Sequence, residues 1–212
     1  MTYKASGIVL AGGKSTRMGT DKAMLQYHNK SLLVHSIEKL HELFDEVILV
    51  TDTPGKYHIS GFNTCGIREV SDEYPGSGPL AGIHAGLKST NFEWSFITAC
   101  DMPFWGPEIV EALIREQQDF DAVVPRINDR PEPLCAFYRK TCLPAIESYL
   151  KNGTGKVTGF YQFIKISYLD IKKKGQAEQL SLNTFCNINT PLDYETILSN
   201  QNKERANITH HS

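Results

Sequence analysis

Short apolar runs alternate with longer helix-like stretches along most of the chain. Residues 6–10 and 46–51 are almost continuously apolar, and residues 31–44 between them place apolar side chains at the spacing of one helix face. A short, continuous apolar run is typical of a strand inside a parallel sheet that is covered on both faces. Strand, helix and strand in this order predict a βαβ unit.

The alternation continues toward the C-terminal end. We expect further strands at residues 67–70, 94–99, 122–125 and 134–138, helices at 79–87, 107–118 and 141–151, an edge strand at 164–171 and a last helix from Pro191. Four to six parallel strands paired with these helices predict an α/β fold, a three-layer α/β/α sandwich with a mostly parallel, Rossmann-like sheet. In such sheets ligands bind beyond the carboxyl ends of the strands.

The pattern shows no repeat and no linker. With 212 residues the chain is long enough for one good core. We therefore expect a single domain over residues 1–199, followed by a polar, disordered tail at residues 200–212, where Ile208 is the one large apolar residue.

Composition narrows the location and the partners. Lys and Arg number 22 and Asp and Glu number 24, so no nucleic-acid surface and no polybasic membrane anchor are expected. The five cysteines form no CxxC pair, which favours free thiols in a reducing compartment. The N-terminal apolar run is shorter than the core of a signal peptide. These features predict a cytoplasmic protein.

The stretch GIVLAGGKSTRMGTDK at residues 7–22 is typical of a phosphate cradle. The first strand ends there at Gly12 and Gly13, whose missing Cβ atoms let backbone N–H groups approach an anion closely. Arg17 and Lys22 follow in the same loop and can supply positive charge. Phosphoryl-type transfer needs fixed cations over the phosphates more than it needs covalent chemistry. We therefore interpret both cations as catalytic rather than as solvated loop charges.

Two commoner phosphate-binding motifs are excluded by spacing. A Walker A loop needs glycine five residues before Gly13, where Ile8 stands. The pattern G-x-G-x-x-G fails because the next glycines after Gly12 are Gly13 and Gly19.

Asp101 is the second candidate for chemistry. Only Cys100 separates it from the predicted strand 94–99, and a carboxylate at the tip of a buried strand can hold a divalent ion against a triphosphate. Mg²⁺ usually takes one or two protein carboxylates together with phosphate oxygens and waters. A helix cap or a loop aspartate is the ordinary alternative, but the cationic glycine loop elsewhere in the chain favours the metal site. The neighbouring Cys100 is interpreted as inert packing.

Three other groups lie near predicted strand ends. Gly76, Gly78 and Gly82 could admit a planar base or a ribose, or serve simply as turn glycines. Residues 132–134 form a small polar cluster. Residues 187–191, Asn-Ile-Asn-Thr-Pro, could bind a ligand or cap the last helix, and the sequence leaves both readings open.

The chain resembles the molybdenum cofactor guanylyltransferases, also called molybdopterin-guanine dinucleotide synthases, within a wider nucleotidyltransferase superfamily. The resemblance is carried by LAGGKSTRMGTDKA at residues 10–23, GPLAGI at 78–83, ACDMP at 99–103, EPL at 132–134 and FCNINTP at 185–191. The first motif alone indicates only the superfamily, whereas the last one together with CDMP indicates the guanylyltransferase branch. The implied fold is the nucleotidyltransferase type of α/β sheet.

The resemblance also implies roles for the nucleotide half of a site. Leu10, Ala11 and Gly12 would hold the nucleotide, Lys22 would contact its phosphates, and Asp72 would help to bind it.

For the remaining residues it implies a metal and a second substrate. Asp101 would bind the nucleotide and hold Mg²⁺, and the end of the cleft at Asn187 and Asn189 would receive the pterin. The implied reaction transfers GMP from GTP to the terminal phosphate of molybdenum-molybdopterin and releases pyrophosphate, with transient contacts to other molybdenum-cofactor proteins. The alternatives are a cytidylyltransferase for the same pterin, a sugar-1-phosphate nucleotidyltransferase and a non-enzymatic nucleotide-binding or cofactor-chaperone module.

Overall fold

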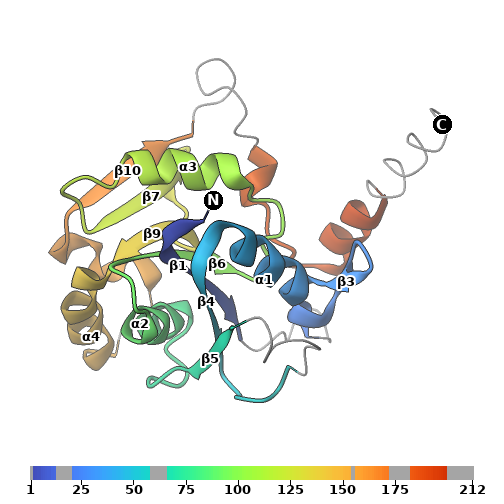
Figure 1. The fold of residues 1–212 in the computed structure, drawn as a ribbon, viewed down its shortest axis with the longest axis horizontal. Coiled ribbons are helices and arrows are strands. Elements are labelled where there is room, and N and C mark those ends of the chain that lie inside the picture. The colour runs from blue at the N-terminus through green and yellow to red at the C-terminus, as the bar shows by residue number, and fades with distance from the viewer. Residues whose placement is uncertain (1, 13–20, 58–65, 154–155, 172–181, 200–212) are drawn as a thin grey trace.

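The structure is a computed structural model that describes residues 2–12, 21–57, 66–153, 156–171 and 182–199. Within these residues, one sheet of eight strands runs in the order β10-β7-β9-β6-β1-β4-β5, with β8 paired to β7 (Figure 1). The strands are β1 Tyr3–Ala11, β4 Phe44–Thr51, β5 Arg68–Ser71, β6 Trp94–Ala99, β7 Ala122–Ile127, β8 Arg130–Pro131, β9 Cys135–Arg139 and β10 Ile166–Asp170.

The helices follow the predicted positions closely. They are α1 Leu32–Leu43, α2 Pro79–Ser89, α3 Pro107–Arg115 and α4 Leu143–Lys151, and residues 191–199 are also helical. Short 3-10 helices are η1 Lys22–Met24, η2 Lys140–Cys142, η3 Val157–Phe163 and η4 Leu182–Phe185, and β2 Gln26–Tyr27 pairs with β3 Lys30–Ser31 in a small hairpin that the pattern did not predict. None of the helices described here has the length and apolar character needed to cross a membrane.

The predicted α/β sheet is confirmed, and it is mostly parallel. Strand β1 pairs in parallel with β4 and β6, β4 with β5, and β10 with β7. Strand β9 departs from this pattern, because it is antiparallel to both β6 and β7. No helix separates β7 from β9, and a parallel neighbour requires a crossover that is usually helical. The predicted edge strand, β10, lies at one edge of the sheet.

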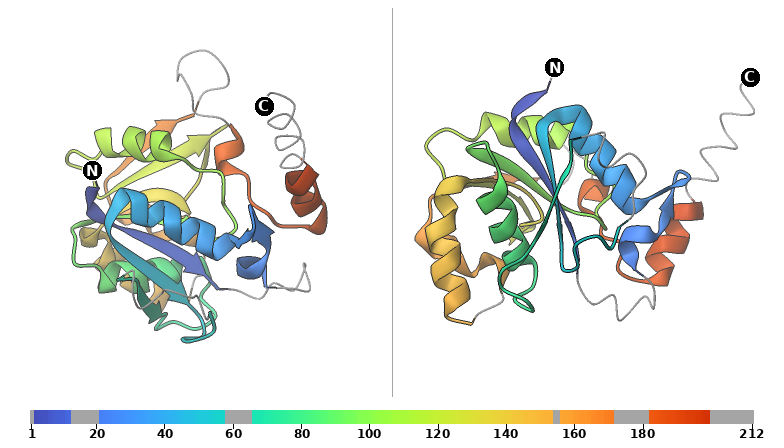
Figure 2. Two further views of the ribbon diagram at one scale, coloured as in Figure 1. Left: turned by 45° about the vertical axis from the view of Figure 1, so that its right-hand side comes forward. Right: turned by 60° about the horizontal axis from the view of Figure 1, so that its bottom comes forward.

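Helices cover both faces of the sheet. Successive strand residues such as Ile8 and Val9 are fully buried in different apolar clusters, because neighbouring side chains point to opposite faces. One cluster includes side chains of α1 and α3, and the other includes side chains of α2 and α4. Figure 1 and the right view of Figure 2 show these helix pairs on the two sides of the sheet. The continuous apolar runs therefore correspond to strands that are covered on both faces.

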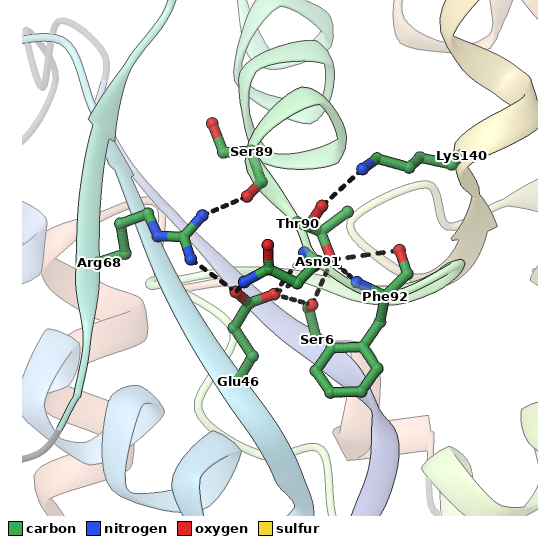
Figure 3. Close-up of polar contacts among 8 residues, drawn as sticks. All are labelled: Ser6, Glu46, Arg68, Ser89, Thr90, Asn91, Phe92 and Lys140. Carbon is green, nitrogen blue, oxygen red and sulfur yellow. Dashed lines mark hydrogen bonds and ion pairs between the residues drawn. The ribbon is translucent and has the colours of Figure 1, made fainter.

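A polar network ties the strands together at the amino-terminal end of the sheet (Figure 3). The Glu46 carboxylate accepts hydrogen bonds from the hydroxyl groups of Ser6 and Thr90 and from the backbone and side-chain amides of Asn91, at 3.0 and 2.7 Å. Arg68 adds an ion pair at 3.0 Å. Burial opposes the ionised form, but the hydrogen bonds and Arg68 outweigh it and hold the pKa of Glu46 below its usual value. This network lies at the opposite end of β1 from Gly12 and is structural.

Candidate functional site

The carboxyl ends of the parallel strands open onto one cavity of about 590 Å³. Strands β1, β4, β5 and β6 run in the same direction, so the residues that follow them meet at one edge of the sheet. Gly12, Asp52, Asp72 and Asp101 occupy these positions and line the cavity together. This is the edge at which a doubly wound sheet is expected to bind a ligand.

Most residues that the sequence predicted for a nucleotide site lie on this cavity. They are Leu10, Ala11, Gly12, Lys22, Asp72 and Asp101. Gly13 and Arg17 fall outside the described residues. Asn187 and Asn189 are exposed and are not among the residues that line the cavity. Lys22 connects Asn189 to the cavity through a hydrogen bond.

The glycines bring backbone close to the cavity. A Cβ built on Gly12 would lie 3.3 Å from the backbone nitrogen of Asp52, so the first loop passes tightly against the end of β4. Gly76 and Gly78 have φ values of 82° and 69°, which favour glycine, and Gly78 precedes the first turn of α2. Both also line the cavity, so their turn geometry and a place beside a ligand are compatible.

Lys22 and Asp101 form an ion pair inside the cavity. The Lys22 ammonium donates to Asp101 Oδ2 at 3.0 Å and to Asn189 Oδ1 at 2.7 Å. The side chains of Lys22 and Asp101 are 19% and 21% exposed, so the pair is partly shielded from water. The backbone of the C-terminal segment reaches the same point, because Ile188 N–H donates to the carbonyl of Asp101 at 2.9 Å.

Asp21 fixes the turn that carries Lys22. Its carboxylate accepts from Ala23 N–H at 3.1 Å and thereby caps η1. Lys56 and the hydroxyl of Tyr57 contact the other carboxylate oxygen at 2.8 and 3.1 Å. Burial opposes the charge of Asp21, but these hydrogen bonds outweigh it and lower the pKa of the carboxyl group. The contacts of Asp21 therefore hold in place the backbone that carries the Lys22 side chain.

The loop that carries Asp101 is anchored from helix α1. The Lys39 ammonium donates to the carbonyl of Pro103 at 2.9 Å and to that of Trp105, and it lies 4.3 Å from the centroid of the Trp105 ring. Burial lowers the pKa of Lys39 to about 8. On the sheet side, Cys100 N–H donates to the carbonyl of Leu10 at 3.1 Å. Burial raises the pKa of the Cys100 thiol, which agrees with its interpretation as inert packing.

Sequence reasoning missed some acidic residues at this edge. Asp52 follows β4, and Asp21 directly precedes Lys22; both line the cavity. The rule that pointed to Asp101, a carboxylate just after a buried strand, would have found Asp52. Glu132 belongs to the cluster that the sequence singled out. Burial raises the pKa of Glu132, and the negative charge of Asp101 adds to the rise.

The sequence left open whether residues 187–191 cap the last helix or bind a ligand. In the structure, Thr190 and Asn189 make different kinds of contact. Thr190 Oγ1 accepts from Asp193 N–H at 3.2 Å, and the Asp193 carboxylate accepts from the N–H groups of Asn189 and Thr190 at 2.9 and 2.8 Å. Reciprocal bonds of this kind cap a helix at its N-terminus. Thr190 is therefore a cap, whereas the side chain of Asn189 points to Lys22.

Comparisons with known proteins identify the family of the chain. The MobA-like NTP transferase domain matches residues 7–165. The molybdenum cofactor guanylyltransferase of Syntrophotalea carbinolica is 38% identical over 194 residues, which are 90% of this chain and 89% of that protein. A probable molybdenum cofactor guanylyltransferase of Pelotomaculum thermopropionicum is 36% identical over 190 residues, 90% of either chain.

A solved structure shows the same similarity in three dimensions. The molybdopterin-guanine dinucleotide biosynthesis protein A of Archaeoglobus fulgidus is 27% identical and superposes with a TM-score of 0.76, covering 93% of this chain and 99% of that one. The chain therefore belongs to the MobA-like NTP transferases, in the family of the molybdenum cofactor guanylyltransferases.

Proposed function

We propose that this nucleotidyltransferase transfers GMP from GTP to the terminal phosphate of molybdenum-molybdopterin and releases pyrophosphate. The observation that carries the proposal is the Lys22–Asp101 pair in a cavity formed by the carboxyl ends of four parallel strands. The names of the relatives support guanylyl transfer as the reaction.

A dianionic acceptor simplifies the chemistry. A phosphate monoester with a second pKa of about 6 is a dianion at neutral pH, so its attack on the α-phosphorus of GTP needs no strong general base. Catalysis then depends on positioning and on neutralising charge. Lys22 would hold phosphate oxygens through its ammonium, and the backbone N–H groups near Gly12 would orient the triphosphate. The leaving group would be pyrophosphate, in line with the attacking oxygen.

Nucleotidyltransferases generally use a divalent metal with the triphosphate, and we propose Mg²⁺ at Asp101. No group of three or more His, Cys, Asp and Glu side chains with metal-site geometry occurs among the residues described here. Mg²⁺ commonly takes only one or two carboxylates plus phosphate oxygens, so a cavity-lining Asp101 fits it. When bound there, the ion would supply positive charge to the triphosphate.

We assign the remaining roles in the same way. Leu10, Ala11 and Asp72 would contact the nucleotide, supported by their place on the cavity wall. Gly13 and Arg17 would complete the phosphate loop; they lie outside the described residues. The end of the cleft at Asn187 and Asn189 would receive the pterin.

Domain organisation and location are part of the proposal. Residues 1–199 would form a single nucleotidyltransferase domain, and 200–212, which lie outside the described residues, a polar tail. A cytoplasmic location is supported by the buried, unbridged thiols of Cys100, Cys135 and Cys142. The other molybdenum-cofactor proteins would be transient partners.

Pyrophosphate release by the purified protein tests the function. The reactions contain molybdenum-molybdopterin, Mg²⁺ and one of the four ribonucleoside triphosphates, and GTP is expected to support the highest kcat/KM. A preference for CTP would assign the protein to the cytidylyltransferases for the same pterin. Turnover with hexose 1-phosphates and no pterin would indicate a sugar nucleotidyltransferase. Tight nucleotide binding without pyrophosphate release would indicate a binding module.

A further inference from the structure

The Lys22 ammonium has two acceptors from different parts of the chain. Asp101 follows strand β6, and Asn189 precedes the helix at residues 191–199. The two distances, 3.0 Å to the carboxylate and 2.7 Å to the amide oxygen, are both those of good hydrogen bonds. The ammonium thus bridges the strand-end carboxylate and the C-terminal segment.

Hydrogen bonds hold the backbone of Asn189 and its neighbour in place. Its N–H donates to the Asp193 carboxylate at 2.9 Å, and the neighbouring Ile188 donates to the carbonyl of Asp101 at 2.9 Å. Ile188 is fully buried, which anchors the segment to the body of the protein. The amide oxygen of Asn189 therefore stays near the cavity when the side chain of Lys22 moves.

A divalent cation and the Lys22 ammonium compete for the same carboxylate. Oδ2 of Asp101 already accepts from Lys22. Two cations within a few ångströms of each other repel, and the partly shielded site strengthens the repulsion. A metal that binds Asp101 must therefore displace the ammonium, which then needs another acceptor because an unpaired, half-buried charge is costly.

We propose that Asn189 is a positioning residue that supplies this second acceptor. It keeps the Lys22 ammonium in the cleft after a divalent cation has bound the Asp101 carboxylate, so that the ammonium can contact the phosphates of the nucleotide. The inference rests on the proposed function for the identity of the nucleotide, but the exchange between metal and ammonium is independent of the base and of the pterin. Asn189 thus acts through Lys22 and couples the C-terminal segment to metal binding.

The test is a double-mutant cycle on Mn²⁺ binding, followed by electron paramagnetic resonance of free Mn²⁺ without nucleotide or pterin. Asn189→Ala is expected to weaken Mn²⁺ binding by about tenfold, because the displaced ammonium loses its acceptor. Lys22→Met is expected to tighten it severalfold, because the competing cation is gone. In the Lys22→Met background, Asn189→Ala should have no further effect. The variant Asp101→Asn measures how much Mn²⁺ binds to other carboxylates of the protein.

The matched control is Asn152→Ala, an exposed asparagine at the end of α4 that should leave Mn²⁺ binding unchanged. Circular dichroism and thermal unfolding check each variant, and Lys22→Gln replaces Lys22→Met if the latter does not fold. Equal weakening by Asn189→Ala with and without Lys22 would make Asn189 a direct metal ligand and overturn the inference. Unchanged Mn²⁺ binding in Asn189→Ala would also overturn it. The proposed function fails separately, by absence of pyrophosphate release in the unaltered protein.

Discussion

The Lys22 ammonium lies 3.0 Å from the Asp101 carboxylate, although the two residues are 79 positions apart in the chain. Lys22 is the first residue of the 3-10 helix η1, and Asp101 lies just beyond the end of the central strand β6. Their meeting places a cation and a carboxylate at the same point of the cavity. A site of this composition can bind a triphosphate together with its metal.

Removing either member of the pair should slow turnover strongly without unfolding the protein. We expect Lys22→Ala and Asp101→Ala to lower the rate of pyrophosphate release by roughly a hundredfold or more, since a preorganised charge at the reacting group is lost. Both side chains are about one-fifth exposed, so the fold should tolerate the change. Assays of pyrophosphate release with GTP measure the rate. Near wild-type rates in a folded variant would refute the site assignment.

Asp21 should matter to activity through the position of Lys22. Asp21→Ala removes the cap of η1 and the contacts with Lys56 and Tyr57. We expect a loss of about 1 kcal/mol in the free energy of unfolding and a fall of roughly tenfold or more in kcat from the misplaced ammonium. Urea titration and pyrophosphate release measure the two effects. Asp119→Ala, an exposed aspartate, is the control and should change neither quantity.

Gly12 should be required for nucleotide binding more than for folding. In Gly12→Ala the new methyl group meets the backbone of Asp52 at 3.3 Å and narrows the approach to the phosphates. The free energy of unfolding should change by less than about 1 kcal/mol, whereas GTP affinity should fall about tenfold, the equivalent of one charge-assisted hydrogen bond. Isothermal titration with GTP and Mg²⁺ checks the affinity. Unaltered affinity would place the phosphates elsewhere.

Glu46 should stabilise the protein in a pH-dependent way. Its side chain is 9% exposed, and Glu46→Gln removes the ion pair with Arg68 and weakens the hydrogen bonds from Ser6 and Asn91. We expect a loss of about 1 to 3 kcal/mol at pH 7. Folding lowers the pKa of Glu46. The contribution of Glu46 to the free energy of unfolding is therefore complete above the pKa that its carboxyl group has in the unfolded chain. It is lost as the pH falls through the pKa of the same group in the folded protein.

Thermal unfolding of both proteins at pH 7, 5 and 3 would measure this dependence. The difference in Tm between the wild-type protein and Glu46→Gln should be largest at pH 7 and should shrink at pH 3. Glu73→Gln is a matched control, because water screens the half-exposed Glu73–Lys88 ion pair and its loss should leave the Tm nearly unchanged. A Tm difference for Glu46→Gln that grows on acidification would contradict the argument.

The elements that pack on both faces of the sheet were predictable from the chain itself. The run at residues 94–99 matches β6 at both ends, and helix α2 begins at Pro79 as its proline indicated. The hairpin β2–β3 was not predictable in this way, since its strands have two residues each and carry no alternation. Its turn residues His28 and Asn29 adopt positive φ, for which the sequence offers no glycine as a signal.

The sequence by itself determined the strand-end residues, because a buried strand needs an apolar run and the first polar or glycine residue after it marks the edge of the sheet. Gly12 and Asp101 follow from that rule, whereas Asp72 was expected only from the family resemblance. Only the tertiary structure decided the direction of β9, which brings its amino end and the nearby Glu132 to this edge, since reversing a strand exchanges its ends. It also decided that Asn189 meets Lys22, a contact 167 positions apart that packing of the C-terminal segment creates and local pattern cannot encode.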